Sequence, residues 1–249
     1  MPVKDDIRTF LQNKEFDKLV ELASRDKKVI RHLTSFLYNE DELLRWRAAE
    51  GFAAIVKSPH VLSIEKIHIL IDRLTINLED QSGGNAWGAI EAFGAIIAAR
   101  PYELDGQIPK LFSFIHDARL WKGILWSARR IGEQDPGLLK NRLHMVIGLL
   151  RNPSKTTRGH AAWTLGAIGD SDVLEILETL QKDTNRIHIY DQGELREVTV
   201  GEIAKRSIAE IKATPQHFKP SALSKKPLRV PGRPRAAKRG VTSRQKPSV

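Results

Sequence analysis

The residues best suited to chemistry in this sequence are a recurring set of tryptophan, glutamate and arginine side chains. The set comprises Trp46, Glu50, Trp87, Glu91, Trp126, Arg129, Arg130 and Trp163. Trp46 and Glu50 stand four residues apart, as do Trp87 and Glu91, and this interval places both members of a pair on one face of a helix. Because tryptophan and arginine are favoured anchors of protein interfaces, the set predicts a surface that binds a protein partner.

A structural role for the same residues is the alternative interpretation. At about 100° per residue, Glu50, Glu91 and Arg129 occupy one aligned column of successive helices, and Trp163 completes that column. Aligned charges on stacked helices would form a ladder of ion pairs, and the tryptophans would pack over it without any role in binding.

Metal and nucleotide chemistry have little support in the sequence. There is no cysteine, and the eight histidines form no H-x-x-x-H or H-E-x-x-H pair, so we expect no metal site. Residues 82–85 (SGGN) precede a helix whose free N–H groups could hold an anion, but no P-loop motif accompanies them. A loop with a helix cap is therefore the favoured interpretation, and we assign no catalytic residue and no cofactor.

Composition favours a folded protein of the cytoplasm. The chain has 249 residues and is 41% hydrophobic, which is enough for a substantial core. The N-terminus carries no signal-peptide pattern, and no apolar run approaches the roughly 20 residues that span a bilayer. We expect no membrane contact.

The elements that must position these side chains are helices arranged in repeating pairs. Helices are expected at 3–13, 15–24, 28–38, 43–56, 64–78, 82–99, 106–116, 120–132, 138–150, 156–168, 173–181 and 201–212. The second helix of successive pairs aligns on a small residue, which gives the column Ala53, Gly94, Gly132 and Gly166 with steps of 41, 38 and 34 residues. This period is typical of two-helix solenoid repeats, whose units must stack to bury their apolar faces.

The repeating unit resembles the short HEAT-like repeat first noted in phycobilisome lyases. Residues 158–170 (RGHAAWTLGAIGD) match its second helix nearly throughout, and residues 47–55 (RAAEGFAAI) are a good second match. The combination of residues 81–94 with 125–133 is similar to a small group of bacterial HEAT-repeat proteins without assigned function. The resemblance covers roughly 28–212, although Arg129 and Arg130 stand where small or apolar residues are usual.

The resemblance implies an all-α fold, an α-α superhelix in which the second helices line a concave groove. The tryptophan, glutamate and arginine residues would then form the floor of that groove. Arg47 and Arg158 each lie six residues after a polar residue at the preceding turn, Asp41 and Asn152 respectively. Such pairs resemble the Asp/Asn–Arg ladder that joins HEAT repeats, so we expect a structural role for both arginines.

The two ends of the predicted array depart from the repeat. Residues 1–26 are expected to form two capping helices, and residues 186–200 (RIHIYDQGELREVTV) alternate around a Gly-containing turn, which predicts a β-hairpin. We expect this hairpin, inserted in the last pair, to cover the C-terminal end of the core. The array would thus occupy 1–212.

A basic tail follows the array. Residues 215–249 hold ten Lys/Arg and no Asp or Glu, so the net charge of +10 belongs entirely to this segment and residues 1–214 are neutral. Residues 213–249 are rich in proline and are predicted to be disordered. Contact with nucleic acid or another polyanion is the proposed role, and a nonspecific solubilising extension is the alternative. The expected contacts are Lys225, Lys226, Arg229, Arg233, Arg235, Lys238, Arg239 and Arg244.

These features favour a non-enzymatic scaffold or adaptor, which binds a protein partner in its groove and a polyanion through its tail. The alternative is a nucleic-acid-binding HEAT-like protein, including the DNA glycosylases that excise alkylated bases with a concave aspartate. Against that alternative, the aligned acids are Glu50 and Glu91 rather than aspartates, and a groove that grips duplex DNA should be basic.

Overall fold

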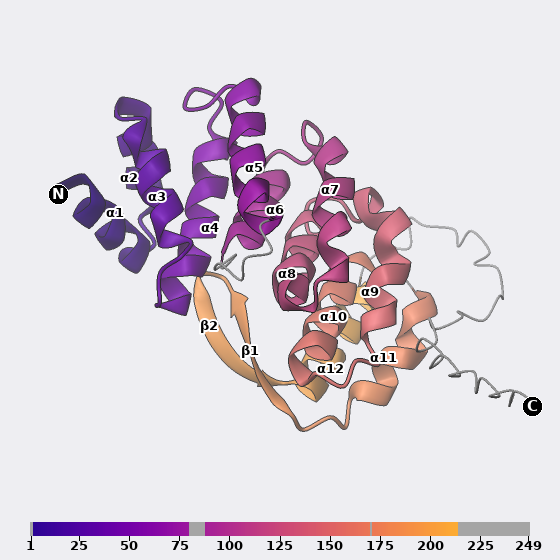
Figure 1. Ribbon diagram of the computed structural model, residues 1–249. Helices are drawn as coiled ribbons and strands as arrows, with labels where there is room; N and C mark the ends of the chain where they lie inside the picture. The colour runs from indigo at the N-terminus through magenta and orange to yellow at the C-terminus, as the bar shows by residue number, and fades with distance from the viewer. Residues whose placement is uncertain (1, 80–87, 170, 214–249) are drawn as a thin grey trace, which may run out of the picture. The chain divides into compact units, whose positions relative to one another are not determined.

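The computed structural model describes residues 2–79, 88–169 and 171–213, which belong to one compact unit (Figure 1). This part of the chain is mostly helical, with a single two-stranded sheet near its C-terminal end. The first half contains α1 (Pro2–Asn13), α2 (Phe16–Arg25), α3 (Lys28–Phe36), α4 (Glu42–Lys57), α5 (Ile64–Glu79) and α6 (Ala89–Ala99). The second half contains α7 (Ile108–Ser113), α8 (Trp121–Gly132), α9 (Leu143–Leu149), α10 (Lys155–Ile168), α11 (Leu174–Leu180), β1 (Arg186–Asp191), β2 (Glu194–Thr199) and α12 (Val200–Ala213).

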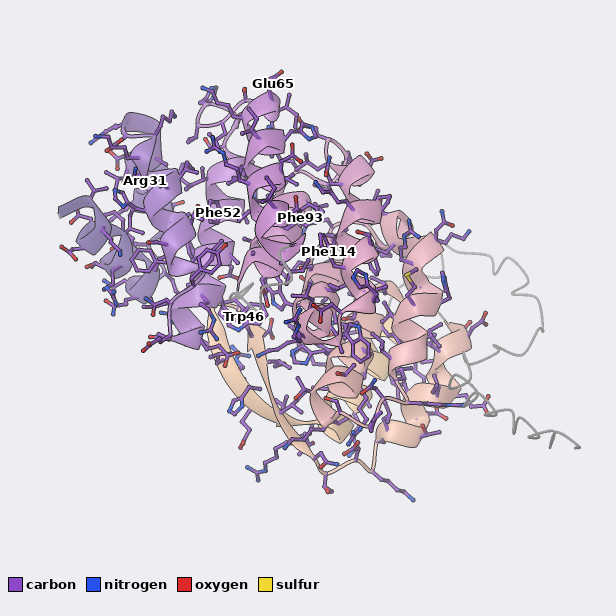
Figure 2. All side chains as sticks on the ribbon, in the orientation of Figure 1. Arg31, Trp46, Phe52, Glu65, Phe93 and Phe114 are labelled. Atoms are coloured by element: carbon purple, nitrogen blue, oxygen red, sulfur yellow. The ribbon has the colours of Figure 1, made fainter. Side chains whose placement is uncertain are left out.

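The second helices of the predicted pairs pack against one another in chain order. Helix α4 contacts α6, α6 contacts α8, α8 contacts α10, and α10 contacts α12. The first helices α3, α5, α9 and α11 each pack on the second helix that follows them. Figure 2 shows Phe52 and Phe93 on the adjacent helices α4 and α6, and both side chains are fully buried. The shared core therefore runs between successive pairs.

Small residues let these helices approach closely. A Cβ added to Gly94 would lie 1.9 Å from Ser127 Oγ on α8, and one added to Gly132 would lie 2.0 Å from Ile168 Cγ2 on α10. Real Cβ atoms do not approach other atoms so closely, so these two positions of the predicted column require glycine. Ala53, the first member of that column, is only half-buried.

Two predicted helices are shorter and less regular than expected. In place of a helix over 106–116, α7 covers only Ile108–Ser113 and lies between 3₁₀ turns at Asp105–Gln107 and Phe114–His116. In place of a helix over 138–150, a 3₁₀ segment at Pro136–Arg142 precedes α9. Pro109 and Pro136 each stand in the first turn of their segment, where the missing N–H costs least. The first residues of the helix predicted at 82–99 fall within 80–87, which lie outside the described residues.

The predicted hairpin is confirmed and lies between α11 and α12, but it reaches farther than expected. Strands β1 and β2 pair antiparallel from Arg186↔Thr199 to Asp191↔Glu194, and the two turn residues Gln192 and Gly193 have φ of 52° and 81°. Positive φ at both positions is the type I′ geometry that suits a two-residue hairpin. The hairpin does not merely cover the C-terminal end of the core, because Lys14, just after α1, bonds to Glu194 and Arg47 of α4 bonds to Gly193 in its turn. Its buried residues face the second helices, whereas α12 packs on α10.

Candidate functional site

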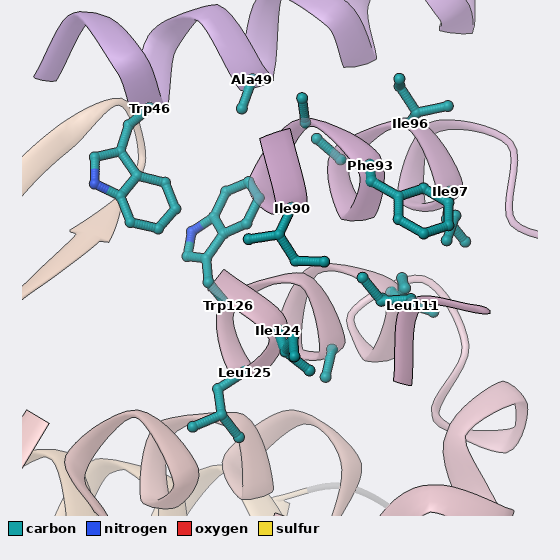
Figure 3. Packing of buried hydrophobic residues seen from close by; sticks show 14 of the residues in the cluster. Trp46, Ala49, Ile90, Phe93, Ile96, Ile97, Leu111, Ile124, Leu125 and Trp126 are labelled. Atoms are coloured by element: carbon teal, nitrogen blue, oxygen red, sulfur yellow. The ribbon is translucent and has the colours of Figure 1, made fainter. Parts of the chain in front are cut away.

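An aromatic cluster joins the hairpin to the second helices. Tyr190 of β1 stacks on Trp46 of α4, with ring centroids 5.2 Å apart and planes 8° from parallel. Trp126 of α8 lies 5.1 Å from Trp46 and 6.1 Å from Tyr190, and its Nε1–H donates to the Tyr190 carbonyl at 3.0 Å. Figure 3 shows the two indoles facing each other beside the hairpin. All three side chains are buried, so the hairpin occupies the face that the sequence assigned to a partner.

The charged members of the predicted column do not pair with one another. The Tyr190 hydroxyl donates to Glu50 Oε2 at 2.6 Å, and burial raises the pKa of both groups. Arg129 instead donates to Glu210 of α12 at 3.0 and 3.2 Å, and forms an ion pair with Glu133. The alternative, a ladder of Glu50, Glu91 and Arg129, is therefore wrong, because Glu50 and Arg129 each pair with a residue outside it.

The remaining predicted groove residues near α10 are also engaged within the protein. Trp163 is buried, its carbonyl accepts from Arg129 at 2.6 Å, and the Arg129 guanidinium lies 4.7 Å from the Trp163 ring centroid. Arg130 pairs with Glu133 at 2.8 Å and lies 5.9 Å from the Trp126 ring. Trp87 lies outside the described residues, as does the entire predicted polyanion-binding tail.

Arg47 forms hydrogen bonds with the hairpin and α1 rather than with the preceding turn. Its Nε donates to Gly193 O at 3.0 Å, its Nη1 to the α1 carbonyls of Leu11 and Gln12 at 3.3 and 2.6 Å, and its Nη2 to Glu194 at 3.1 Å. Asp41 caps α4 instead, by accepting from the first backbone N–H groups of that helix. The expected pair of Arg47 with Asp41 is wrong, although a structural role for Arg47 remains consistent with these bonds.

Arg158 follows the expectation more closely. Its Nη1 donates to the carbonyls of Asn152 and Pro153 at 3.5 and 2.8 Å, so it does bind the preceding turn, through backbone rather than side-chain atoms. Its Nε forms an ion pair with Asp183 at 2.6 Å. This contact, first of several hydrogen bonds, lowers the pKa of Asp183 to about 2.

A pocket of about 170 Å³ opens where α4, α6 and α8 begin. Its lining consists of Glu42, Arg45, Trp46, Gly88, Glu91, Arg119 and Lys122. Gly88 precedes α6 with φ of 77°, and a Cβ there would lie 2.6 Å from Leu37 O, so both the backbone and the space require glycine. Two of the predicted site residues, Trp46 and Glu91, are brought together here.

Most charges in the pocket are matched by a neighbour. Lys122 Nζ bonds to Glu42 Oε1 and lies 5.3 Å from the Trp46 ring centroid, while Trp46 Nε1–H donates to the same Glu42 oxygen at 3.2 Å. Burial alone would raise the pKa of Glu42, but the bonds from Lys122 and Trp46 outweigh it and lower that pKa. Arg119 lies at the exposed rim and forms an ion pair with Asp117 at 2.7 Å.

Glu91 is the exception among the pocket charges. Its Oε2 is buried and has no hydrogen-bond partner among the described residues, although the residue as a whole keeps partial exposure. The other oxygen lies against α8, because a Cβ on Gly123 would stand 2.7 Å from Oε1. Burial raises the pKa of the Glu91 carboxyl, and the nearby Lys122 and Arg45 counteract it only in part. The pocket therefore contains one unsatisfied acceptor.

Sequence reasoning missed five of the seven lining residues, Glu42, Arg45, Gly88, Arg119 and Lys122. One signal was available, because Glu42 precedes Trp46 by the same four residues that separate Trp46 from Glu50. The predicted Trp–Glu pairs extend only from each tryptophan toward the C-terminus, so they do not include the N-terminal ends of the helices. The contact of Lys122 with Glu42 joins residues 80 positions apart, and no local pattern predicts it.

Two other kinds of feature, a metal-binding cluster and a membrane-spanning helix, are absent from the described residues. No cluster of three or more His, Cys, Asp or Glu residues could hold a metal ion in this part of the chain. Across the same residues, no helix combines the length and apolar character needed to cross a membrane.

Comparisons with known proteins give little beyond distant similarity. No family model matches the chain. An uncharacterized protein of Archaeoglobus fulgidus is 27% identical over 168 residues, which cover 66% of this chain and 86% of that protein. The crystal structure of an engineered protein is 16% identical and covers 85% of this chain and 97% of its own, with a TM-score of 0.37.

Proposed function

We propose that the protein is a non-enzymatic scaffold, built as a HEAT-like solenoid, that binds a protein partner at the N-terminal ends of its second helices. The supporting arrangement is the order of contacts, in which α4, α6, α8, α10 and α12 pack in succession, and α4, α6, α10 and α12 are each backed by the helix before them. Stacked helix pairs of this kind present surfaces contributed by several units, which is how repeat proteins bind their partners.

The single observation that carries the proposal is the pocket between α4, α6 and α8. It combines an aromatic side chain, Trp46, with charges of both signs and with an unsatisfied carboxylate oxygen on Glu91. Three successive second helices contribute to it, as a site built by stacking requires. Trp and Arg are enriched among the residues that dominate interface energetics, and Arg119 at the rim is exposed to an incoming partner.

The proposal differs from the sequence-based one in where the partner binds. The broad face of the second helices is already covered by the hairpin, which buries Trp46 against Tyr190 and Trp126. Removing the hairpin would expose these rings and break the Arg47 bonds, so we place the partner at the pocket instead. Trp126 and Trp163 are likewise buried and offer no exposed ring to a ligand.

A second element of the proposal concerns the basic tail. The ten Lys/Arg in residues 215–249, with no acidic residue, would supply electrostatic attachment to nucleic acid or another polyanion. This part rests on charge alone, and it adds to the pocket without depending on it.

Affinity capture with the full chain tests the scaffold proposal. Arg119→Glu reverses the charge at the pocket rim, where the side chain is 72% exposed, and should leave the fold intact. Arg31→Glu is the matched control, because Arg31 is an exposed arginine on α3, outside the pocket lining. We expect wild type and Arg31→Glu to retain a stoichiometric partner that Arg119→Glu loses.

Two results would count against the scaffold. One is the absence of any stoichiometric partner for the wild-type chain in extracts of its source. The other is equal recovery by Arg119→Glu once circular dichroism has shown that variant to be folded. Substitution of Arg129 is a poor test, because its buried bonds to Glu210 and Trp163 make loss of stability the expected outcome.

A further inference from the structure

We propose that two copies of this chain pack side by side through α5, in parallel and related by a two-fold axis that runs along the helices. The contact surface consists of Ile69, Ile76 and the charged residues that flank them on α5. It lies apart from the pocket, because no residue of α5 lines that site. The inference therefore goes beyond the scaffold proposal and does not depend on it.

Two exposed isoleucines on α5 are the first argument. Ile69 is 51% exposed and Ile76 is 63% exposed, and they are two of the three large apolar side chains exposed in the described part of the chain. Seven residues separate them, so at about 100° per residue they lie on one face of the helix, two turns apart. Scattered exposed apolar residues are common, but an aligned pair at this spacing is the pattern of a seam between two helices.

Charges of opposite sign flank the isoleucine seam on its two sides. Relative to Ile69, Glu65 and Asp72 stand about 40° and 60° to one side of the helix. Lys66 and Arg73 stand about 60° and 40° to the other side. All four side chains are exposed, and Figure 2 shows Glu65 at the end of α5, at the periphery of the protein. One side of the seam is therefore acidic and the other is basic.

A second copy in parallel orientation matches this charge pattern. A two-fold axis along the helices places the acidic side of one α5 opposite the basic side of the other. Glu65 then faces the partner's Lys66, and Asp72 faces the partner's Arg73, because the members of each pair differ by only about 1.5 Å along the axis. The two-fold axis makes each pair occur twice, and each isoleucine meets its own counterpart at the centre of the seam.

The same charges disfavour the antiparallel orientation. Its two-fold axis lies perpendicular to the helices and would place acidic side against acidic side and basic side against basic side. Like charges that face each other across an interface select against that arrangement.

The acidic side of α5 already binds a cation within the chain. Lys110 of α7 forms an ion pair with Asp72 at 3.0 Å, yet Asp72 stays 65% exposed, so a second cation can approach it. Exposed ion pairs add little affinity, so the charges set the orientation while the isoleucines supply the apolar contact. A single helix pair is also small for an interface, and the dimer is therefore weak and dependent on concentration.

Sedimentation velocity of the full chain over a concentration series tests for the dimer. We expect the weight-average mass to rise with concentration toward that of two chains. Ile69→Glu places two like charges side by side at the centre of the seam, and it should weaken self-association at least tenfold. Tyr102→Glu is the matched control, because Tyr102 is 70% exposed but does not belong to α5, and it should leave self-association unchanged.

Disulfide trapping measures the orientation, since the chain has no cysteine of its own. Helix axes lie about 8–10 Å apart and Cα atoms about 2.3 Å from each axis, so facing Cα atoms come to about 5 Å, within reach of a disulfide. Oxidation should therefore link two Ile69→Cys chains to each other far more efficiently than two Tyr102→Cys chains. In an antiparallel dimer, an Ile69→Cys chain would instead link to an Ile76→Cys chain.

Four results would overturn the proposal. A wild-type chain that stays monomeric at its highest soluble concentration excludes the dimer, whether or not every variant folds. Equal self-association by wild type and folded Ile69→Glu places the contact elsewhere. Preferential linkage of Ile69→Cys to Ile76→Cys reverses the orientation. A different protein that wild type captures and Ile69→Glu loses, from a chain that is itself monomeric, assigns α5 to that protein rather than to a second copy.

Discussion

Replacement of Arg47 by methionine should be among the most damaging single changes in this protein. The Arg47 side chain is only 7% exposed, and its guanidinium makes four hydrogen bonds to two separate parts of the chain, α1 and the hairpin. Two of its acceptors, Leu11 O and Gln12 O, are carbonyls in the last turn of α1, and Leu11 O also accepts from Lys14 N at 3.3 Å. Methionine retains the aliphatic stem and removes every donor.

The expected loss of stability follows from these contacts. Removing one partner of a buried, hydrogen-bonded charge pair costs about 3–5 kcal/mol. Glu194 is 42% exposed and keeps its bond from Lys14, so Lys14 and water still satisfy its carboxylate in the variant. The loss of stability therefore arises mainly at the three backbone carbonyls that lose the guanidinium. We therefore expect about 3–4 kcal/mol, which corresponds to a fall in Tm of roughly 10 °C for a domain of this size.

Urea denaturation and hydrogen exchange measure the two parts of this prediction. Denaturation gives the free energy of unfolding, and exchange at β1 and β2 reports whether the hairpin has loosened. Arg47→Lys keeps the charge without the planar fork and should show an intermediate loss. Arg31→Met, at an exposed arginine, should stay within about 0.5 kcal/mol of wild type. An Arg47→Met protein within about 1 kcal/mol of wild type, or with unchanged hairpin exchange, would refute the reasoning.

Three further predictions concern packing, pH and the tail. Gly94→Ala should lower the free energy of unfolding by about 3 kcal/mol, because its Cβ would stand 2.9 Å from a backbone atom of α8. Gly148 faces open space, so Gly148→Ala should be neutral or stabilising, and urea denaturation of both variants measures the difference. The pKa of Asp183 is about 2 when folded against an ordinary 3.8, so its stabilisation is present above pH 3.8 and is lost as the pH falls through about 2. Asp183→Asn should flatten this acid limb of the stability curve, and an unchanged limb would assign it to other carboxylates. Truncation after Ala213 should leave Tm unchanged and abolish salt-sensitive binding to RNA or DNA in a filter assay, and binding that survives would place the polyanion site on the helices.

Local sequence patterns predicted the elements well where periodicity was strong. The second helices and the hairpin follow directly from apolar spacing and from the Gln192-Gly193 turn, since these depend on residues close in the chain. The segments before α8 and α9 were predicted as regular helices because their apolar spacing is helical. Short 3₁₀ turns at 105–107, 114–116 and 136–142 interrupt that regularity.

The candidate site was far less predictable than the fold. Trp46 and Glu91 were singled out by their spacing, but their environment depends on contacts between distant residues, such as that of Tyr190 with Glu50. Alternation in 186–191 indicated a strand with a buried face without indicating which surface would bury it. The hairpin covers Trp46 and Trp126, which the sequence placed on the floor of an open groove.

The hairpin also fixes the number of helix pairs that this protein can have. Its turn must reach Arg47 and Lys14 while its other end stays joined to α12, and each six-residue strand spans only about 20 Å. Packed helices lie about 8–10 Å apart, so an added pair between α4 and α10 would carry Arg47 out of reach by about three strand residues. On the proposed solenoid, duplication of a helix pair would therefore require a matching extension of both strands. The length of the hairpin thus limits how far apart the first and last helices of the described chain can lie.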